Sequence, residues 1–254
     1  MSQPTVAALA LPLDFELVFS DGEPLETEWH SIQLPFLREL ILQLMKERGR
    51  RDSYVGGDMF MYYSVEQARE VAEGQPYLRG PDVFWVESAD PDRERQGWVA
   101  WEEGGRLPDV IIELSSPATA EIDHTVKRTL YSQIFRTSEY YIYQPNTRKL
   151  EGFRLADRFY QAMKLDAQGR LWSDRLGAFL GLWHGIRENQ ERDWVRLYRA
   201  DGSLVLSGEE QAEVERQRAK AAHHEAEAAH HRAEAAEAEL ARLRALLQGR
   251  STRV

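Results

Sequence analysis

The chain has 254 residues, of which 43% are hydrophobic and 10% aromatic, so it can bury a sizeable core and is not a wholly disordered protein. It contains no cysteine, which excludes disulfides, thiolate zinc sites and cysteine nucleophiles. The net charge is −10. The segment from Glu209 onward has nine acidic and eight basic residues, a net charge of −1, so the residues before Glu209 carry −9. An acidic domain is not typical of tight, nonspecific nucleic-acid binding, which depends on cations that contact phosphates.

No segment of the sequence indicates a membrane helix or an export signal. The longest apolar runs, such as 110–112 and 140–143, are far shorter than the ~20 residues of a membrane-spanning helix. The first 15 residues have no basic stretch and contain Asp14, which does not fit a secretory signal. We therefore expect a cytoplasmic protein without a membrane partner.

The first regular element is an amphipathic helix over residues 28–48. Apolar side chains recur in it at helical spacing from Ile32 to Met45, apart from Pro35 near its start, and Gly49 fits its end. Strand-like runs follow at 54–63, which is broken by Gly56-Gly57, and at 82–86, 98–101 and 109–114.

A second helix is predicted where Ile122, Val126, Leu130 and Ile134 recur four residues apart, with Thr119 as its N-cap. Later strands are predicted over residues 140–143, 153–155, 159–165 and 194–197. This order of a helix, three strands, a helix, a strand and then mostly strands predicts an α/β or α+β domain with a mixed sheet.

The composition changes abruptly after Ser207-Gly208, where aromatic residues and prolines cease. The heptad AAHHEAE at 221–227 is followed by the closely similar AAHHRAE at 228–234. Small or apolar residues are spaced alternately three and four apart, as at the seam of a coiled coil. These residues are Ala219, Ala222, Ala226, Ala229, Ala233, Ala236, Leu240, Leu243 and Leu247.

The C-terminal segment is therefore predicted to be a helix of about 40 residues, ~60 Å long, that associates with itself or with a partner helix. Leu240, Leu243, Leu246 and Leu247 are its expected anchor, since alanine buries little area. We divide the chain into a globular domain over residues 1–208, a coiled-coil helix over residues 209–249 that ends at Gly249, and a disordered tail over residues 250–254.

Carboxylates at the ends of apolar strands are the strongest sign of chemistry. Glu113 follows Val110-Ile111-Ile112, where a carboxylate is costly to bury unless it is paired. Asp82 stands at the head of another strand, and two carboxylates from neighbouring strands can bind one divalent cation. Asp109 lies ~13 Å from Glu113 along the same strand, too far to share that ion. Lys127, on the next helix, can reach the same pocket and stabilise an attacking hydroxide or phosphoryl charge.

The same residues have structural interpretations. Glu113 could pair with an arginine such as Arg128 or Arg136. Asp123 and Lys127 are four residues apart, where an exposed ion pair worth ~0.3–0.5 kcal/mol is ordinary. Spacing alone leaves these alternatives open.

Histidine pairs in the C-terminal helix have two interpretations as well. His223 and His224 recur seven residues later as His230 and His231, so the pairs face one way and could bind a soft metal or respond to pH near 6.5. Because they lie off the predicted seam, a solvated helix face is the favoured interpretation.

Several motifs together resemble one nuclease family. The run PDVIIELSSPATAEID, followed by Lys127, Tyr131 and SEYYIYQP, is similar to the Uma-two family, a branch of the restriction-endonuclease-like PD-(D/E)xK superfamily. GGDMFMYY, GPDVFWV and WEEGGRLPD fit the same family in the same order. The resemblance covers about residues 12 to 206 and implies a mixed sheet core flanked by helices, in the order α-β-β-β-α-β, with a long coiled-coil-type helix after it.

The resemblance also implies roles for individual residues. Asp82 and Glu113 match the two acidic positions of the family, and Asp58 in GGDMF is a further acidic candidate. The superfamily's usual lysine position is Ser115 here, and the family takes its lysine from the following helix, which gives Lys127. Asp82, Glu113 and Asp58 are thus the expected metal ligands, for Mg²⁺ or Mn²⁺, and Asp82, Glu113 and Lys127 the expected catalytic residues.

The function implied by the resemblance is a magnesium-dependent endonuclease that hydrolyses DNA phosphodiester bonds. The heptad pattern separately predicts a homo-oligomer, or pairing with a partner helix, through residues 209–249. The acidic domain and the missing lysine at Ser115 favour an alternative. In that interpretation, the protein is a catalytically inactive nuclease fold that acts as an assembly or adaptor module through its C-terminal helix.

Overall fold

The computed structural model describes residues 13–19, 27–75 and 80–251, with side chains described as far as residue 242. The chain divides into two compact units, residues 1–205 and residues 206–254. Residues 1–12, which bear on the expected absence of a secretory signal, lie outside the described part. None of the helices in the described residues combines the length and the apolar character that crossing a bilayer requires.

The elements of the first unit are, in chain order, α1 (Glu28–Glu47), β1 (Ser53–Gly56), β2 (Met61–Tyr62), α2 (Val65–Ala72), β3 (Val83–Glu87), β4 (Trp98–Val99), the 3₁₀ turn η1 (Ala100–Glu103), β5 (Val110–Leu114), α3 (Ala120–Ile122), the π-helical η2 (Asp123–Lys127), α4 (Arg128–Leu130), the π-helical η3 (Tyr131–Phe135), β6 (Glu139–Gln144), β7 (Lys149–Ala156), β8 (Phe159–Ala162), β9 (Leu171–Ser173), β10 (Ala178–Arg187) and β11 (Gln190–Tyr198). The second unit contains α5 (Gly208–Ser251).

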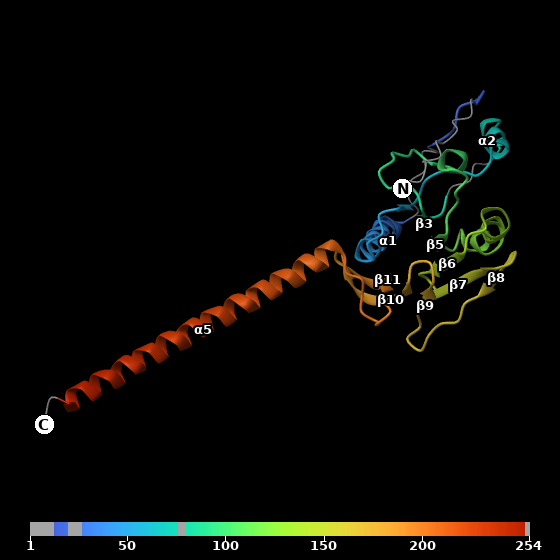
Figure 1. Ribbon diagram of the computed structural model, residues 1–254. Helices are drawn as coiled ribbons and strands as arrows, with labels where there is room; N and C mark the ends of the chain where they lie inside the picture. Colours follow the sequence, from blue (N-terminus) through green and yellow to red (C-terminus); the bar gives the residue numbers. More distant parts are fainter. Residues whose placement is uncertain (1–12, 20–26, 76–79, 252–254) are drawn as a thin grey trace. The chain divides into compact units, whose positions relative to one another are not determined.

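The central sheet is mixed and has the strand order β1-β3-β5-β6-β7-β8 (Figure 1). Only β5 and β6 run parallel in it, and the helical residues 120–135 supply the crossover that a parallel pair needs. β9, β10 and β11 form a second, antiparallel sheet, and β2 pairs with β4. The predicted mixed sheet with flanking helices and a long C-terminal helix is confirmed.

The two faces of the central sheet bury different layers, because side chains alternate along each strand. Every second residue of β5, from Val110 to Leu114, packs with α1 and the second sheet. Ile111 faces the helical residues 120–135, and Glu113 is on the same face. The strand therefore carries a carboxylate into a layer of buried aromatic side chains.

The helix over residues 120–135 exists as predicted, but its predicted apolar stripe does not face the core. Ile122, Val126 and Ile134 are 48%, 64% and 51% exposed. The inward positions are instead spaced by four, at Asp123, Lys127, Tyr131 and Phe135. Four residues of a regular α-helix overshoot one turn by ~40°, and the wider π turns η2 and η3 reduce that drift.

Thr119 occupies the N-cap position, as predicted, but its side chain caps no helical N–H. Its Oγ1 instead accepts the backbone N–H of Ser116 at 3.0 Å. Ser116 Oγ in turn accepts the N–H of Thr119 at 3.3 Å. Each hydroxyl thus accepts the backbone N–H of the other residue, and the two bonds stabilise the turn after β5.

Some strands differ from their predictions. β9 and β10 correspond to no predicted strand, and the glycines at 181 and 185 interrupt the β10 pattern. The run 98–101 is a strand only at Trp98–Val99 and continues as the turn η1. The run 54–63 forms two strands, β1 and β2, that belong to different sheets.

α5 is longer than predicted. It continues through Gly249 to Ser251, so Gly249 does not end the helix. The first two residues of the predicted disordered tail, 250 and 251, are therefore helical. Residues 252–254 lie outside the described part. At its start, Ser207 Oγ accepts the N–H of Glu210 at 3.3 Å, and Glu210 Oε2 accepts the N–H of Ser207 at 2.8 Å. This reciprocal pair is a capping box. The predicted leucine anchor beyond Leu240 falls on side chains that are not described.

α1 is fastened to the second sheet by one buried glutamine. Gln33 donates from Nε2 to the carbonyl of Val195 at 3.2 Å and accepts the N–H of Val195 at 2.8 Å. Because β11 is an edge strand of the second sheet, the amide satisfies two backbone groups that no neighbouring strand reaches.

Gln33→Ala should lower the free energy of unfolding by roughly 2–5 kcal/mol, because it leaves two buried backbone groups without a partner. Gln43→Ala, at a partly exposed position of the same helix, should change it by no more than about 0.5 kcal/mol. Urea denaturation of both variants measures the difference. Similar values for the two variants would contradict the role given to Gln33.

Candidate active site

Asp82 and Glu113 meet at the end of the β3–β5 ladder. In the antiparallel register Val83 lies opposite Ile112, which brings the next two residues, Asp82 and Glu113, together. The N–H of Asp82 donates to Glu113 Oε2 at 3.4 Å, and the N–H of Leu114 donates to Asp82 Oδ2 at 2.6 Å. Two acidic residues that are 31 positions apart in the chain thus converge.

Glu113 is fully buried and has two further partners from the helical residues 120–135. Its Oε1 accepts the hydroxyl of Tyr131 at 2.9 Å, and its Oε2 lies 3.0 Å from Nζ of Lys127. The predicted pairing of Glu113 with Arg128 or Arg136 is wrong. Arg128 lies over the ring of Phe153, and Arg136 donates to a backbone carbonyl.

Lys127 also contacts a residue whose role the sequence did not reveal. Its Nζ lies 3.0 Å from Asp123 Oδ1, so the i,i+4 pair exists, but the prediction that it is solvent-exposed is wrong. Asp123 is only 1% exposed. A signal was present in the sequence, because Asp123, Lys127 and Tyr131 recur every four residues and therefore share one side of the helix.

Three carboxylates and one ammonium make this site strongly acidic. Burial, together with the charge of Glu113, raises the pKa of Asp82 well above its usual value, although Lys127 acts in the opposite direction. Burial lowers the pKa of Lys127, but the charges of Glu113, Asp123 and Asp82 outweigh burial and raise it overall. Lys127 is therefore an ammonium ion at neutral pH, suited to stabilise negative charge rather than to accept a proton.

The site opens into a pocket of about 210 Å³. Its lining residues are His30, Leu34, Asp58, Gly80, Asp82, Leu114, Thr119, Ile122, Asp123 and Lys127. Asp58 is thus in the same pocket as Asp82, but its side chain is exposed and forms no ion pair within the described part of the chain.

Two glycines allow the Asp58 turn to lie against Asp82. A β-carbon on Gly57 would stand 2.3 Å from the carbonyl oxygen of Asp82, and one on Gly80 would stand 2.2 Å from that of Met59. Real atoms do not approach so closely, so larger residues would push the two segments apart. The glycines in GGDMF and GPDVF therefore have a direct part in bringing the acidic residues together.

His30, which the sequence analysis missed, holds the end of β5 from the α1 side. Its Nε2 donates to the carbonyl of Leu114 at 2.6 Å, and its Nδ1 lies 2.8 Å from the hydroxyl of Thr27. Only its position in the fold reveals this role, since a lone histidine in an amphipathic helix has no distinguishing pattern.

A larger cavity of about 520 Å³ lies elsewhere, beside residues 93–97. Two of its acidic lining residues, Glu102 and Glu103, are paired with Arg93 and Arg95 at 2.7 and 2.8 Å. We place the candidate site in the smaller pocket, because Asp82, Asp123 and Lys127 line it and connect it to the buried carboxylate of Glu113.

The donor set fits a hard divalent cation. Among the described residues no group of three or more acidic or histidine side chains is arranged to hold a metal ion. Mg²⁺, however, usually takes only one or two protein carboxylates and completes its shell with water and substrate phosphate. Asp82 and Glu113 supply two carboxylates, and the uncompensated charge around them would be offset by such an ion.

The raised pKa of Asp82 predicts a pH-dependent effect on stability. In the unfolded chain Asp82 ionises near pH 3.9, whereas the folded protein retains its proton to higher pH, so ionisation costs stability as the pH rises through the folded pKa. In EDTA, Asp82→Asn should therefore be more stable than the wild type at pH 8, and the two should converge near pH 4. Thermal unfolding across this range measures the effect, with Asp58→Asn as a control that should follow the wild type. A less stable Asp82→Asn at pH 8 would contradict the direction of the shift.

The Uma2 family model, described as "Putative restriction endonuclease", matches residues 8–187, a segment that includes Asp82, Glu113 and Lys127. The search of curated proteins finds no match. The family match covers more than half of the 254 residues and confirms the resemblance drawn from the sequence. The chain belongs to the Uma2 family of restriction-endonuclease-like proteins.

Proposed function

We propose that the protein is a metal-dependent endonuclease that hydrolyses DNA phosphodiester bonds with Mg²⁺ or Mn²⁺. One observation carries the proposal: the oxygens of Asp82 and Glu113 converge beside the Lys127 ammonium in a pocket. Family membership supports the nuclease activity, and DNA is the substrate class we assign.

In this proposal Asp82 and Glu113 hold the cation, with Asp58 available at the pocket surface. When bound, the cation would neutralise charge on the phosphate and lower the pKa of a water molecule. Glu113 is held in position by Tyr131, whose hydroxyl fixes one carboxylate oxygen. The other oxygen lies between Lys127 and the N–H of Asp82.

Lys127 stabilises the negative charge that develops on the phosphoryl oxygens. In the structure, the Lys127 ammonium neutralises the Glu113 carboxylate. Lys127 therefore has to move away from Glu113 Oε2 when a cation binds to that oxygen. Asp123 provides a second buried carboxylate at 3.0 Å, which keeps the ammonium in the pocket during this exchange. We therefore regard Asp123 as the residue that positions Lys127.

Full-length protein with Mg²⁺ or Mn²⁺ should cleave one or more of single-stranded, duplex and branched DNA, and Glu113→Ala should abolish cleavage. Lys127→Ala should lower the rate by about 10²–10³-fold, because one preorganised charge is lost. Lys149→Ala is the matched control, since Lys149 is an exposed lysine whose ion pair with Glu151 lies outside the pocket, and it should cleave like the wild type. Equal cleavage by the wild type and Glu113→Ala would indicate a contaminating nuclease.

Metal binding can be measured without activity. Mg²⁺ at a hundred times its dissociation constant should stabilise the wild type by about 2.7 kcal/mol. Asp82→Asn should gain much less, because a neutral amide replaces one of the two anionic ligands. Thermal unfolding against Mg²⁺ or Mn²⁺ concentration gives the result. Equal stabilisation of the two proteins would remove Asp82 from the metal site.

A second candidate function is an inactive nuclease fold that acts as an assembly or adaptor module through α5. It is favoured by the ion pair between Lys127 and Glu113, which partly neutralises the site without a cation, and by the excess of acidic residues before Glu209. A chain that ends at Ser207 separates the two. The nuclease would keep its activity, whereas the adaptor would lose its partners and no substrate would ever be cleaved.

A further inference from the structure

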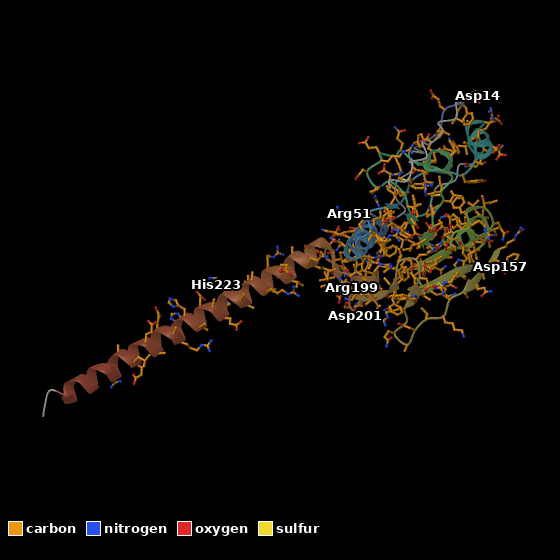
Figure 2. The ribbon with its side chains drawn as sticks, in the orientation of Figure 1. Asp14, Arg51, Asp157, Arg199, Asp201 and His223 are labelled. Atoms are coloured by element: carbon orange, nitrogen blue, oxygen red, sulfur yellow. The ribbon has the colours of Figure 1, made fainter. Side chains whose placement is uncertain are left out.

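α5 presents a patterned surface that nothing covers within the second unit. Every described side chain from residue 212 to residue 242 is exposed. Figure 2 shows side chains that project from the described part of the helix, with His223 labelled. Ion pairs within the helix, such as Glu213 with Arg216 and Glu215 with Arg218, stabilise it by only a few tenths of a kcal/mol each.

The seam residues assign a heptad register to α5. Ala219, Ala226, Ala233 and Leu240 take position a, and Ala222, Ala229 and Ala236 take position d. The residues that flank this seam are charged or titratable. Position e is Arg216, His223, His230 and Glu237, and position g is Arg218, Glu225, Arg232 and Glu239.

We propose that α5 pairs with α5 of a second copy of this chain as a parallel, in-register coiled coil. In a parallel pair, each g residue meets the e residue five positions later on the other helix. Arg232 then meets Glu237 of the second copy. Glu225 meets His230, which becomes attractive when the imidazole is protonated, whereas Arg218 with His223 does not contribute.

The flanking charges select a second copy as the occupant, but they do not select the orientation. An antiparallel pair would place Glu225 beside Arg232 and Glu237 beside Arg216, which is also favourable. Residue size decides the orientation. The parallel pair sets Leu240 against its own copy and needs no polar residue in the seam between 219 and 240.

In the antiparallel pair, Leu240 would lie opposite Glu215. Leu240 against Glu215 would bury a carboxylate or expose the leucine. The alanine part of the seam buries little area, so like-with-like contact of the leucines is the larger apolar contribution. The parallel register is therefore the more stable of the two.

Cysteine cross-linking tests both pairing and orientation in the full-length protein, because the chain has no cysteine of its own. Ala219→Cys and Ala236→Cys place a thiol on the seam. Ala221→Cys and Ala235→Cys place it at outward positions and are the matched controls. In the parallel dimer each seam variant should form an interchain disulfide at least ten times faster than its control, since seam Cα atoms come within bonding range.

Two results would overturn the proposal. One is an interchain disulfide that forms only when the Ala219→Cys protein is mixed with the Ala236→Cys protein, because an antiparallel pair places these two positions opposite each other. The other is equal cross-linking of seam and outward variants together with a monomer mass by light scattering at about 50 µM.

Charge reversal provides an independent readout. Arg232→Glu or Glu237→Arg should each raise the dimer dissociation constant roughly tenfold, because two contacts per dimer become repulsive. The double variant should restore wild-type dimerisation, since the pair is rebuilt with its signs exchanged. Glu234→Arg, at an outward position, is the control and should have little effect. Failure of the double variant to recover would contradict the parallel register. Sedimentation measures all four, and none of the outcomes depends on nuclease activity.

Discussion

The buried carboxylate of Glu113 constrains the whole face of the sheet on which it lies. β5 carries it into a layer of aromatic side chains, where an unpaired charge would be prohibitively unstable. The hydroxyl of Tyr131, the ammonium of Lys127 and the N–H of Asp82 supply the partners that make burial tolerable. The helical residues 120–135 must therefore turn a polar side toward the sheet, and their apolar stripe is left in solvent.

That arrangement also explains the electrostatic character of the pocket. Burial and the neighbouring charge of Glu113 raise the pKa of Asp82. The three carboxylates near the Lys127 ammonium outweigh its burial and keep it protonated. A site with this surplus of negative charge is not optimal for stability on its own. Such a surplus is typical of functional sites, where a ligand completes the charge balance. The pKa shifts and the donor set thus favour the same conclusion, a hard cation beside a fixed ammonium.

The two units of the chain depend on different physics. In the first unit, buried aromatic and aliphatic layers on both faces of the mixed sheet provide stability, and specific polar contacts such as Gln33 with Val195 fix the register of one layer on another. In the second unit, no described side chain from residue 212 to residue 242 is buried, and a capping box and local ion pairs add to the backbone hydrogen bonds of α5. Its heptad pattern is informative because an isolated helix has no need of one.

β9 and β10 were not predicted, whereas the sequence alone predicted the helix over residues 28–48, the strands at Asp82 and Glu113, and the long C-terminal helix. These features depend on local periodicity and on glycine and proline positions, which neighbouring residues reveal. The same strand patterns indicated that two distant carboxylates belong to neighbouring strands, and the family resemblance added Lys127.

Only the tertiary structure decided which side of the helix over residues 120–135 faces the core. By periodicity, Ile122, Val126 and Ile134 mark the buried side, yet the charge of Glu113 requires Asp123, Lys127 and Tyr131 there instead. Likewise, Asp123 and His30 are ordinary in sequence and acquire a role only through contacts with β5 or its partners. A residue's local pattern does not include the buried charge that a distant strand brings to it, and in this protein that charge determines the orientation of the helix.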